Sequence, residues 1–412
     1  MKQEICNSET VVHENSIVNL KFTAKWNDDN GQHSAIQYIE KFNVWRDIDL
    51  LPKELVDSIL HFPKGEGEYK NIKPENLKNG RQESLMKTIP VINFNGYLSN
   101  GDCVTPKSGR FYPKGWFSGV DGFYSDNMFP ARAVKVDEDN IVIDYNHPLA
   151  ALDIEIKVDI VDIYPPTDEH GGRCSDAIDL LLNNGPGMQL FNQFGNTDFL
   201  SNTALSRVDN DDDRLFYKKL RKVHHLDSYA RETVSSIYEE LIKPGSRVLD
   251  LMASWESHIP DSLSNIVLSG LGMNTDELTS NQLINDYLVH DLNVHPALTY
   301  ENEVYDAVIC TASVEYLIKP LEVFKEVKRV LKPGGVFIVT FSNRWFPTKA
   351  ISLWSEIHEF ERVGLVMEYF KQTNWTAQVN SLSSKGRHRP EDDPHYDKTQ
   401  ISDPVYAVWC VK

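Results

Sequence analysis

The stretch YDAVICTASVEYLIKPLEVFKEVKRVLKPGGVFIVTFSN, residues 305–343, decides the fold of the C-terminal half of this chain. It begins with a continuous β-branched run at 305–314, which is typical of a strand covered on both faces. Apolar residues at helical spacing follow, and KPGG at 332–335 ends that helix before a second apolar run at 336–343. This alternation predicts a parallel sheet with covering helices.

The same alternation extends upstream of this stretch. Ser228 begins a predicted helix with an apolar face, and Pro244-Gly245 ends it before a buried strand at 247–251. A further strand and turn are predicted at 265–274. Because ligands of such sheets bind beyond the carboxyl ends of the strands, the residues that follow each strand are the candidates for a site.

In this order of elements, residues 228–345 resemble the class I S-adenosylmethionine-dependent methyltransferases, in particular the family labelled type 11. The segment 305–343 carries the most specific part of the resemblance. The resemblance implies a Rossmann-like α/β domain with a mostly parallel sheet. It also implies S-adenosyl-L-methionine as cofactor and methyl transfer as the reaction.

The resemblance places the amino acid part of the cofactor at the end of the 247–251 strand. Asp250 matches the family's acid there, but the following loop, 252–257, contains none of the family's glycines. Ala253 and Ser254 remain small, and Ser254 offers a hydroxyl to the cofactor carboxylate. Glu256 offers a partner for its ammonium group. The alternative is that Asp250 merely caps the next turn and the pocket is closed.

Further strand ends supply the rest of the predicted cofactor site. Where the family has an acid that binds the ribose, this chain has Gly272, and Asn274 is the nearest residue able to accept and donate. Asp291 matches the acid that accepts from the adenine amino group, with Leu292 as the backbone contact. Thr311 completes the predicted set. Asn274 as an ordinary turn residue and Asp291 as a surface acid are the alternatives.

The methyl acceptor is expected beside the loops that follow 305–314 and 336–343. Glu315 and Tyr316 are predicted to act as a base or to orient the nucleophile. His258 is the third catalytic candidate, because an imidazole with a pKa near neutrality suits proton removal. A helix cap or a buried structural role is the alternative for His258.

Three residues are predicted to contact the acceptor. Trp255 and Trp345 would form walls of its pocket, although aromatic residues near strand ends also serve in cores. Arg344 would recognise an acidic group, because a guanidinium matches a carboxylate or a phosphate. A surface ion pair is the equal alternative for Arg344.

The first 165 residues have a different pattern. Runs at 17–26 and 152–163 alternate apolar and polar residues, as half-buried strands do, and 134–150 reads as a hairpin. The motif IVIDYNHPLAALDIEIKVDIVDI, 141–163, resembles SlyD-type peptidyl-prolyl isomerases of the FKBP class. The resemblance implies a β-rich α+β domain with an inserted chaperone-like flap at 105–148, which would bind unfolded peptide.

The composition shift after Pro165-Pro166 predicts a multidomain chain: a SlyD/FKBP-like domain at 1–165, a linker at 166–213 and a methyltransferase-like domain at 214–412. A length of 412 residues agrees with more than one domain. The net charge of −18 argues against nucleic acid as a partner. The basic stretch 217–225 is interpreted as a solvated face.

The sequence favours a soluble protein. Neither a long apolar run nor a secretory signal is present, so no membrane association is expected. Five cysteines without C-x-x-C spacing predict reduced thiols, no zinc site and a cytoplasmic location.

Two functions from different classes remain open. One is a methyltransferase acting on a small molecule or on a polypeptide presented by the N-terminal domain. The other is a methyltransferase fold that has lost catalysis and serves as a scaffold for a chaperone or isomerase module.

Overall fold

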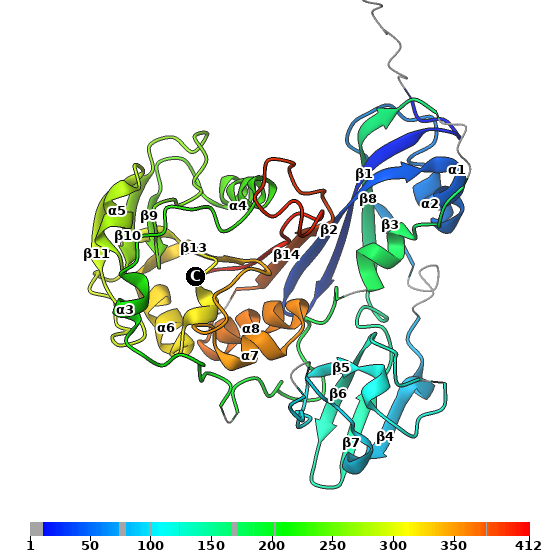
Figure 1. Ribbon diagram of the computed structural model, residues 1–412, viewed down its shortest axis with the longest axis horizontal. Helices are drawn as coiled ribbons and strands as arrows, with labels where there is room; N and C mark the ends of the chain where they lie inside the picture. Colours follow the sequence, from blue (N-terminus) through cyan, green and yellow to red (C-terminus); the bar gives the residue numbers. More distant parts are fainter. Residues whose placement is uncertain are drawn as a thin grey trace, which may run out of the picture.

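A single mixed sheet of eleven strands runs through most of the chain (Figure 1). The computed structural model describes residues 11–73, 80–98, 101–122, 124–166, 171–183, 185–201, 203–375 and 377–412. Along the sheet, the strands follow the order β11-β10-β9-β12-β13-β15-β14-β2-β1-β8-β3.

The C-terminal half supplies the first seven strands of this order. They are β9 (Arg247–Leu251), β10 (Val267–Gly272), β11 (Ile284–Val289), β12 (Tyr305–Thr311), β13 (Leu331–Phe341), β14 (Val379–Lys385) and β15 (Val405–Val411). The strands β9 to β13 are parallel, whereas β15 runs antiparallel to both of its neighbours. Because β9 pairs with β10 on one side and with β12 on the other, the strand order reverses at β9. Such a reversal opens a crevice at the carboxyl ends of the strands.

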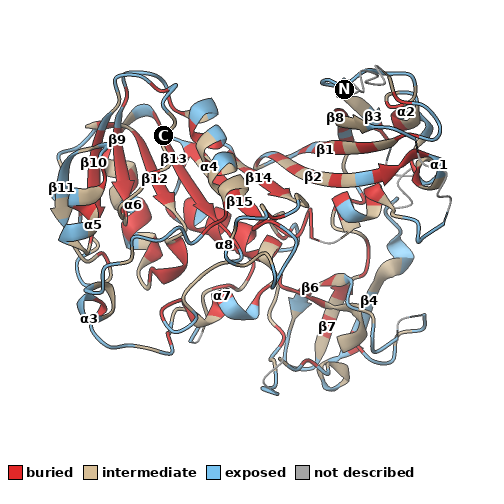
Figure 2. Cartoon of the chain, turned by 45° about the horizontal axis from the view of Figure 1, so that its top comes forward, coloured by how far each residue is buried: buried red, intermediate tan, exposed pale blue. Residues whose placement is uncertain are grey.

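Helices cover both faces of this part of the sheet. They are α3 (Asp213–Tyr217), α4 (Ser228–Leu241), α5 (Thr275–Ser280), α6 (Pro320–Val330), α7 (Ser352–Glu356) and α8 (Glu359–Gln372). Successive side chains of a strand point to opposite faces. Accordingly, Val248 packs in the core under α4, and Leu249 in the larger core with α6 and α8. The strands β9, β12 and β13 are buried on both faces (Figure 2), as the sequence predicts for 305–314.

The predicted alternation of strands and helices is wrong at two connections. Residues 252–266 join β9 to β10, and residues 290–304 join β11 to β12, as loops and turns without a helix. Proline and polar residues, including Pro260, break any helical apolar spacing there. The start of α4 also differs by one residue, because Asp227 rather than Ser228 is the N-cap and accepts from the backbone N–H of Ala230.

The N-terminal part adds the other four strands to the same sheet. They are β1 (Ile17–Asp28), β2 (Gly31–Asn43), β3 (Lys70–Ile72) and β8 (Ile154–Tyr164), with the short helices α1 (Val44–Asp47) and α2 (Lys53–Val56) beside them. They enclose a core of their own. The parallel pair β14 and β2 joins the two halves through backbone hydrogen bonds, with Ser383 opposite Ala35.

A second sheet of four strands lies between β3 and β8 in the chain and hangs below the N-terminal strands in Figure 1. Its strands are β4 (Met86–Pro90), β5 (Phe111–Pro113), β6 (Pro130–Val136) and β7 (Asn140–Asp144). The pair β6 and β7 forms the predicted hairpin. We call residues 86–144 the insert. It begins 19 residues before the predicted flap start at residue 105, because β4 pairs with β7.

The predicted linker contributes side chains to both halves. Leu181 and Leu182 are buried in the N-terminal core, whereas Met188 and Phe199 belong to the C-terminal core. The division at 165 and 213 remains a prediction, and 166–213 is packed in part where the structure describes it, with exposed residues between the buried ones. No helix in the described residues is both long and apolar enough to cross a bilayer.

Candidate active site

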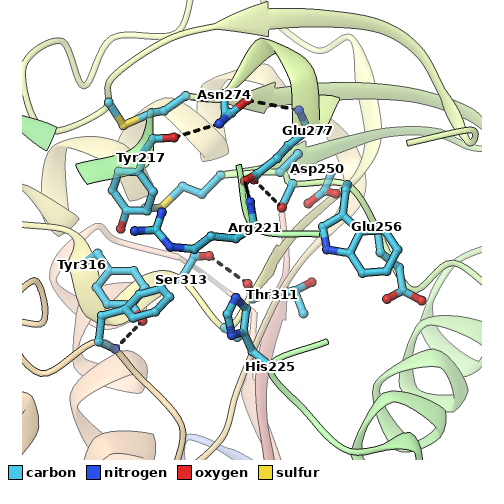
Figure 3. Close-up of a pocket in the computed structure, with 18 of the residues that line it drawn as sticks. Tyr217, Arg221, His225, Asp250, Glu256, Asn274, Glu277, Thr311, Ser313 and Tyr316 are labelled. Carbon is cyan, nitrogen blue, oxygen red and sulfur yellow. Dashed lines mark hydrogen bonds between the residues drawn. The ribbon is translucent and has the colours of Figure 1, made fainter. Parts of the chain in front are cut away.

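A cavity of about 190 Å³ lies at the carboxyl ends of β9, β10, β11 and β12, where the strand order reverses (Figure 3). Eleven of the predicted site residues line it: Asp250, Ala253, Ser254, Trp255, Glu256, His258, Asn274, Asp291, Leu292, Thr311 and Tyr316. Glu315, Arg344 and Trp345 are absent from its lining. The residues come together because four strands end at one edge of the sheet.

The loop after β9 takes a glycine-like course without glycine. Met252 has φ +62° and lies in the left-handed region that non-glycine residues seldom adopt. The N–H of Ala253 donates to the carbonyl of Leu271, 2.7 Å away, so the loop lies directly on the end of β10. A Cβ atom on Gly272 would stand 2.3 Å from the carbonyl oxygen of Ala253. The close approach therefore depends on the glycine of β10, and an acid at position 272 is sterically excluded.

Asp250 lies beneath this loop and is 3% exposed. Its carboxylate accepts from the Ser257 hydroxyl at 2.6 Å, and Ser257 accepts from the Asn281 amide at 2.8 Å. Burial raises the pKa of Asp250 to about 7, although the Ser257 hydrogen bond opposes the rise. Asp250 thus anchors the loop as well as lining the cavity.

Glu256 already has basic partners within the protein. Its carboxylate lies 2.9 Å from Nδ1 of His224, 3.7 Å from the Arg231 guanidinium and 3.6 Å from Nδ1 of His258. The Trp255 ring packs against His224 at a tilt of 46°, with ring centroids 4.8 Å apart. Burial lowers the pKa of His258, while Glu256 opposes that effect. These residues form one wall of the cavity.

The end of β10 brings a carboxylate that sequence reasoning missed. Glu277, in the first turn of α5, accepts from the Ser254 hydroxyl at 2.7 Å and from the Arg221 backbone N–H at 2.8 Å. Asn274 is the N-cap of α5 and donates to the carbonyl of Tyr217 at 2.9 Å. Figure 3 shows the hydrogen bond between Arg221 and Glu277 and the one between Asn274 and Tyr217. Asn274 is thus engaged as a cap, and Glu277 is the better ribose candidate at this strand end.

The ends of β11 and β12 complete the cofactor side. Oδ1 of Asp291 accepts from the N–H groups of Asn293 and Val294, which fixes the loop after β11. Leu292 is buried beside it. The Thr311 hydroxyl shares a 2.6 Å hydrogen bond with Tyr238 of α4. The next residue in the chain, Ala312, has φ +45°, a second strained position at a strand end.

The opposite wall, toward β12 and β13, is aromatic and basic. The Tyr316 hydroxyl accepts from the Phe346 N–H at 2.9 Å, and the two rings stack. His225 packs edge-on against Phe346, with ring centroids 5.3 Å apart. Burial, then the charge of Arg221, lowers the pKa of His225. A neutral imidazole therefore faces this side of the cavity at pH 7.

Three predicted residues have other roles. Glu315 is 1% exposed, outside the cavity lining, and burial raises its pKa to about 8, which disagrees with direct contact to an acceptor. Arg344 donates to Asp403 at 2.9 Å, which is the ion pair considered as its alternative. Trp345 packs under the Arg362 guanidinium. Arg344 and Trp345 thus lie outside the cavity lining, and their substrate contacts stay predictions.

The segment 213–226 was the main omission from the sequence analysis. It crosses the carboxyl ends of the strands and places Tyr217, Arg221 and His225 in the cavity lining. Its basic stretch was interpreted as a solvated face. Most of the stretch 217–225 is exposed, as the solvated-face interpretation expects, and only Tyr217 and Arg221 are partly buried. The signal available in the sequence was its mixture of basic and aromatic residues. Within the described parts of the chain, no cluster of histidine, cysteine and acidic side chains suits a metal ion.

Comparison with known proteins agrees with this geometry. Residues 270–339 match the family model described as "Methyltransferase domain". No curated protein matches the sequence. Solved structures that resemble the chain include S-adenosylmethionine-dependent methyltransferases from Archaeoglobus fulgidus, Aquifex aeolicus and Methanosarcina mazei.

These three structures are distant from the present chain. The Archaeoglobus structure has 14% identity and a TM-score of 0.33, covering 49% of this chain and 100% of its own. The Aquifex structure has 14% identity and a TM-score of 0.30, with 48% and 96% covered. The Methanosarcina structure has 12% identity and a TM-score of 0.29, with 43% and 96% covered. On the strength of the family match, the C-terminal half of this chain contains a methyltransferase domain, matched over residues 270–339.

Proposed function

We propose that the cavity at the strand ends binds S-adenosylmethionine along β9, β10 and β11 and receives the methyl acceptor on its β12 and β13 side. The observation that carries this proposal is the gathering of Asp250, Glu277 and Asp291 around one cavity at the reversal of strand order. The aromatic and basic residues lie on the other side of the same cavity. When bound, the cofactor supplies an electrophilic methyl group.

The chain's own residues then have distinct tasks. Glu277 offers a carboxylate to the ribose hydroxyls, and Asp291 offers its second oxygen to the adenine amino group. The loop at 252–254 lies where it shields the methionine part from water. Positioning and exclusion of water contribute much of the acceleration in a transfer of this kind.

His225 is the proposed base for an acceptor that must lose a proton. It lines the cavity on the acceptor side, and its lowered pKa leaves the imidazole neutral near pH 7. His258 lies on the other wall beside Glu256, and Tyr316 is engaged with Phe346. Of the histidines that line the cavity, His225 therefore suits proton removal best.

Calorimetric titration with S-adenosylmethionine tests the cofactor site. Asp291→Ala should weaken binding about tenfold or more, because a hydrogen bond to a charged group contributes about 1.5–3 kcal/mol. Asp261→Ala, an exposed acid outside the cavity, is the matched control and should bind like the wild type. No heat with the wild-type protein would contradict the proposal and favour the scaffold function.

We also propose that the N-terminal part, which resembles SlyD-type proteins, binds extended polypeptide through the insert. The insert exposes large apolar side chains to solvent: Ile92, Tyr97, Tyr124, Met128 and Phe129. Exposed apolar groups of this size are typical of surfaces that bind other proteins. A polypeptide acceptor held there would make the chain a protein methyltransferase, and a small-molecule acceptor would leave the two activities independent.

A refolding assay with the full chain tests the polypeptide site. Tyr124→Ser together with Met128→Ser should reduce suppression of aggregation of an unfolded client protein. Val208→Ser, which replaces a residue 79% exposed outside the insert, is the control. Equal suppression by all three proteins would contradict a binding role for the insert.

A further inference from the structure

Arg221 and Tyr217 place a guanidinium and a phenol hydroxyl in the lining of the cavity. Arg221 lines the cavity, and among the described residues its guanidinium makes no ion pair with a carboxylate. NH1 donates to the carbonyls of Phe216 and Lys219, at 3.0 and 3.2 Å, which fixes the plane of the group. The Nε and NH2 atoms remain available for a ligand.

The aromatic rings around Arg221 orient this guanidinium. Its central carbon lies 4.4 Å from the centre of the Phe216 ring and 5.4 Å from that of Phe346. Stacking of this kind holds a guanidinium flat and leaves its edge for in-plane hydrogen bonds. Since Phe346 follows β13, the guanidinium lies on the β12 and β13 side, whereas the backbone N–H of Arg221 points to Glu277.

Tyr217 supplies the second polar group. Its hydroxyl is buried and has no hydrogen-bond partner within the described residues, although Tyr217 lines the cavity. An unsatisfied buried hydroxyl costs free energy unless a ligand completes it. Burial, then the charges of Asp213 and Glu315, raise the pKa of this phenol, and the guanidinium groups of Arg207 and Arg221 oppose the rise. Figure 3 shows both side chains on the side of the cavity that faces Tyr316.

The carboxylates of the cavity lining do not neutralise Arg221 directly. Asp213, whose charge reaches Tyr217, is paired with Arg207 and Lys349. An anionic ligand group is therefore the partner that the Arg221 guanidinium lacks among the described residues. We propose that the methyl acceptor carries a carboxylate or phosphate group, which binds the Arg221 guanidinium and the Tyr217 hydroxyl. This inference rests on the proposed function of the cavity.

Calorimetry with the full chain, saturated with S-adenosylhomocysteine, tests the inference. The probes are benzoate, phenyl phosphate and the neutral benzamide, which has nearly the shape of benzoate. The wild type should bind benzoate or phenyl phosphate at least about tenfold more tightly than benzamide, because hydrogen bonds to charged groups are the stronger ones. The preferred anion then identifies the class of acceptor.

Variants show whether Arg221 and Tyr217 are responsible. Arg221→Gln should remove the preference for the anion, and Tyr217→Phe should reduce it, because only the hydroxyl is lost. Arg214→Gln is the matched control: this arginine lies in the same segment, is 78% exposed on its side chain and pairs with Asp212. The Arg214→Gln variant should keep the wild-type preference for the anions over benzamide.

Two results would overturn the inference. One is equal affinity for the anions and benzamide, or no binding of either anion at millimolar concentration. The other is an Arg221→Gln variant whose affinity for S-adenosylmethionine falls, which would assign the guanidinium to the cofactor carboxylate. A wild type that fails to bind S-adenosylmethionine instead contradicts the proposed function, so the two failures are distinguishable.

Discussion

Replacing Gly272 by alanine tests how the glycine-free loop and the end of β10 fit together. The new Cβ would stand 2.3 Å from the carbonyl oxygen of Ala253 and 3.2 Å from Cδ2 of Leu278. Real Cβ atoms essentially never approach closer than 3.0 Å, and the nearest atom is backbone. The loop must therefore move by several tenths of an ångström. That movement strains the hydrogen bond from the Ala253 N–H to Leu271.

The expected magnitude follows from the cost of overpacking. One additional methyl group in a closely packed site costs about 1–3 kcal/mol. If the overpacking destabilises only the loop conformation that binds the cofactor, the Kd for S-adenosylmethionine rises about 5- to 150-fold. If it also destabilises the folded protein, the free energy of unfolding decreases by the remaining part. Calorimetric titration and urea denaturation of the same variant measure both parts.

Gly270→Ala is the matched control in the same strand. Its Cβ would stand 2.5 Å from Cδ1 of Ile284, the far end of a flexible side chain that can rotate away. This variant should keep the wild-type affinity for S-adenosylmethionine. The reasoning is refuted if Gly272→Ala binds as tightly as the wild type with unchanged stability, or if both variants lose affinity equally.

Three further predictions concern other positions. Ala253→Leu should abolish binding of S-adenosylmethionine in calorimetry while thermal unfolding shows an intact fold; unchanged affinity would contradict a role for the small side chain. Glu315→Gln should stabilise the protein at pH 8.5 but hardly at pH 4.5. The folded-state pKa of about 8 exceeds the usual 4.5, so the wild type loses stability as pH rises between these values, at up to about 1.4 kcal/mol per pH unit; parallel pH curves in urea denaturation would refute this. Arg110→Met should cost about 3–5 kcal/mol, because it leaves Glu361 buried without the 3.0 Å ion pair that joins the insert to α8. Lys64→Met, at an exposed pair, should cost less than about 1 kcal/mol, and equal losses would argue against a buried contact.

The sequence by itself determined the elements whose signals are local. The apolar run 305–314 has the β-branched composition of a covered strand, and the turn at 137–139 sets the hairpin of β6 and β7. The acids at 250 and 291 were predicted from the resemblance to the methyltransferase family. The spacing of apolar residues and the residue types found in turns depend on neighbours in the chain, so the sequence alone indicates them.

Only the tertiary structure decided which distant residues share an environment. The 2.3 Å clearance between Gly272 and Ala253, the partnership of Glu277 with Ser254, and the engagement of Arg344 by Asp403 each join separate segments. The parallel pair β2 and β14, nearly 350 positions apart, turned two predicted domains into one sheet. Such contacts are set by how faces pack and which polar groups meet when water is excluded. The sequence pattern of a single segment does not indicate which distant segments will pack against it.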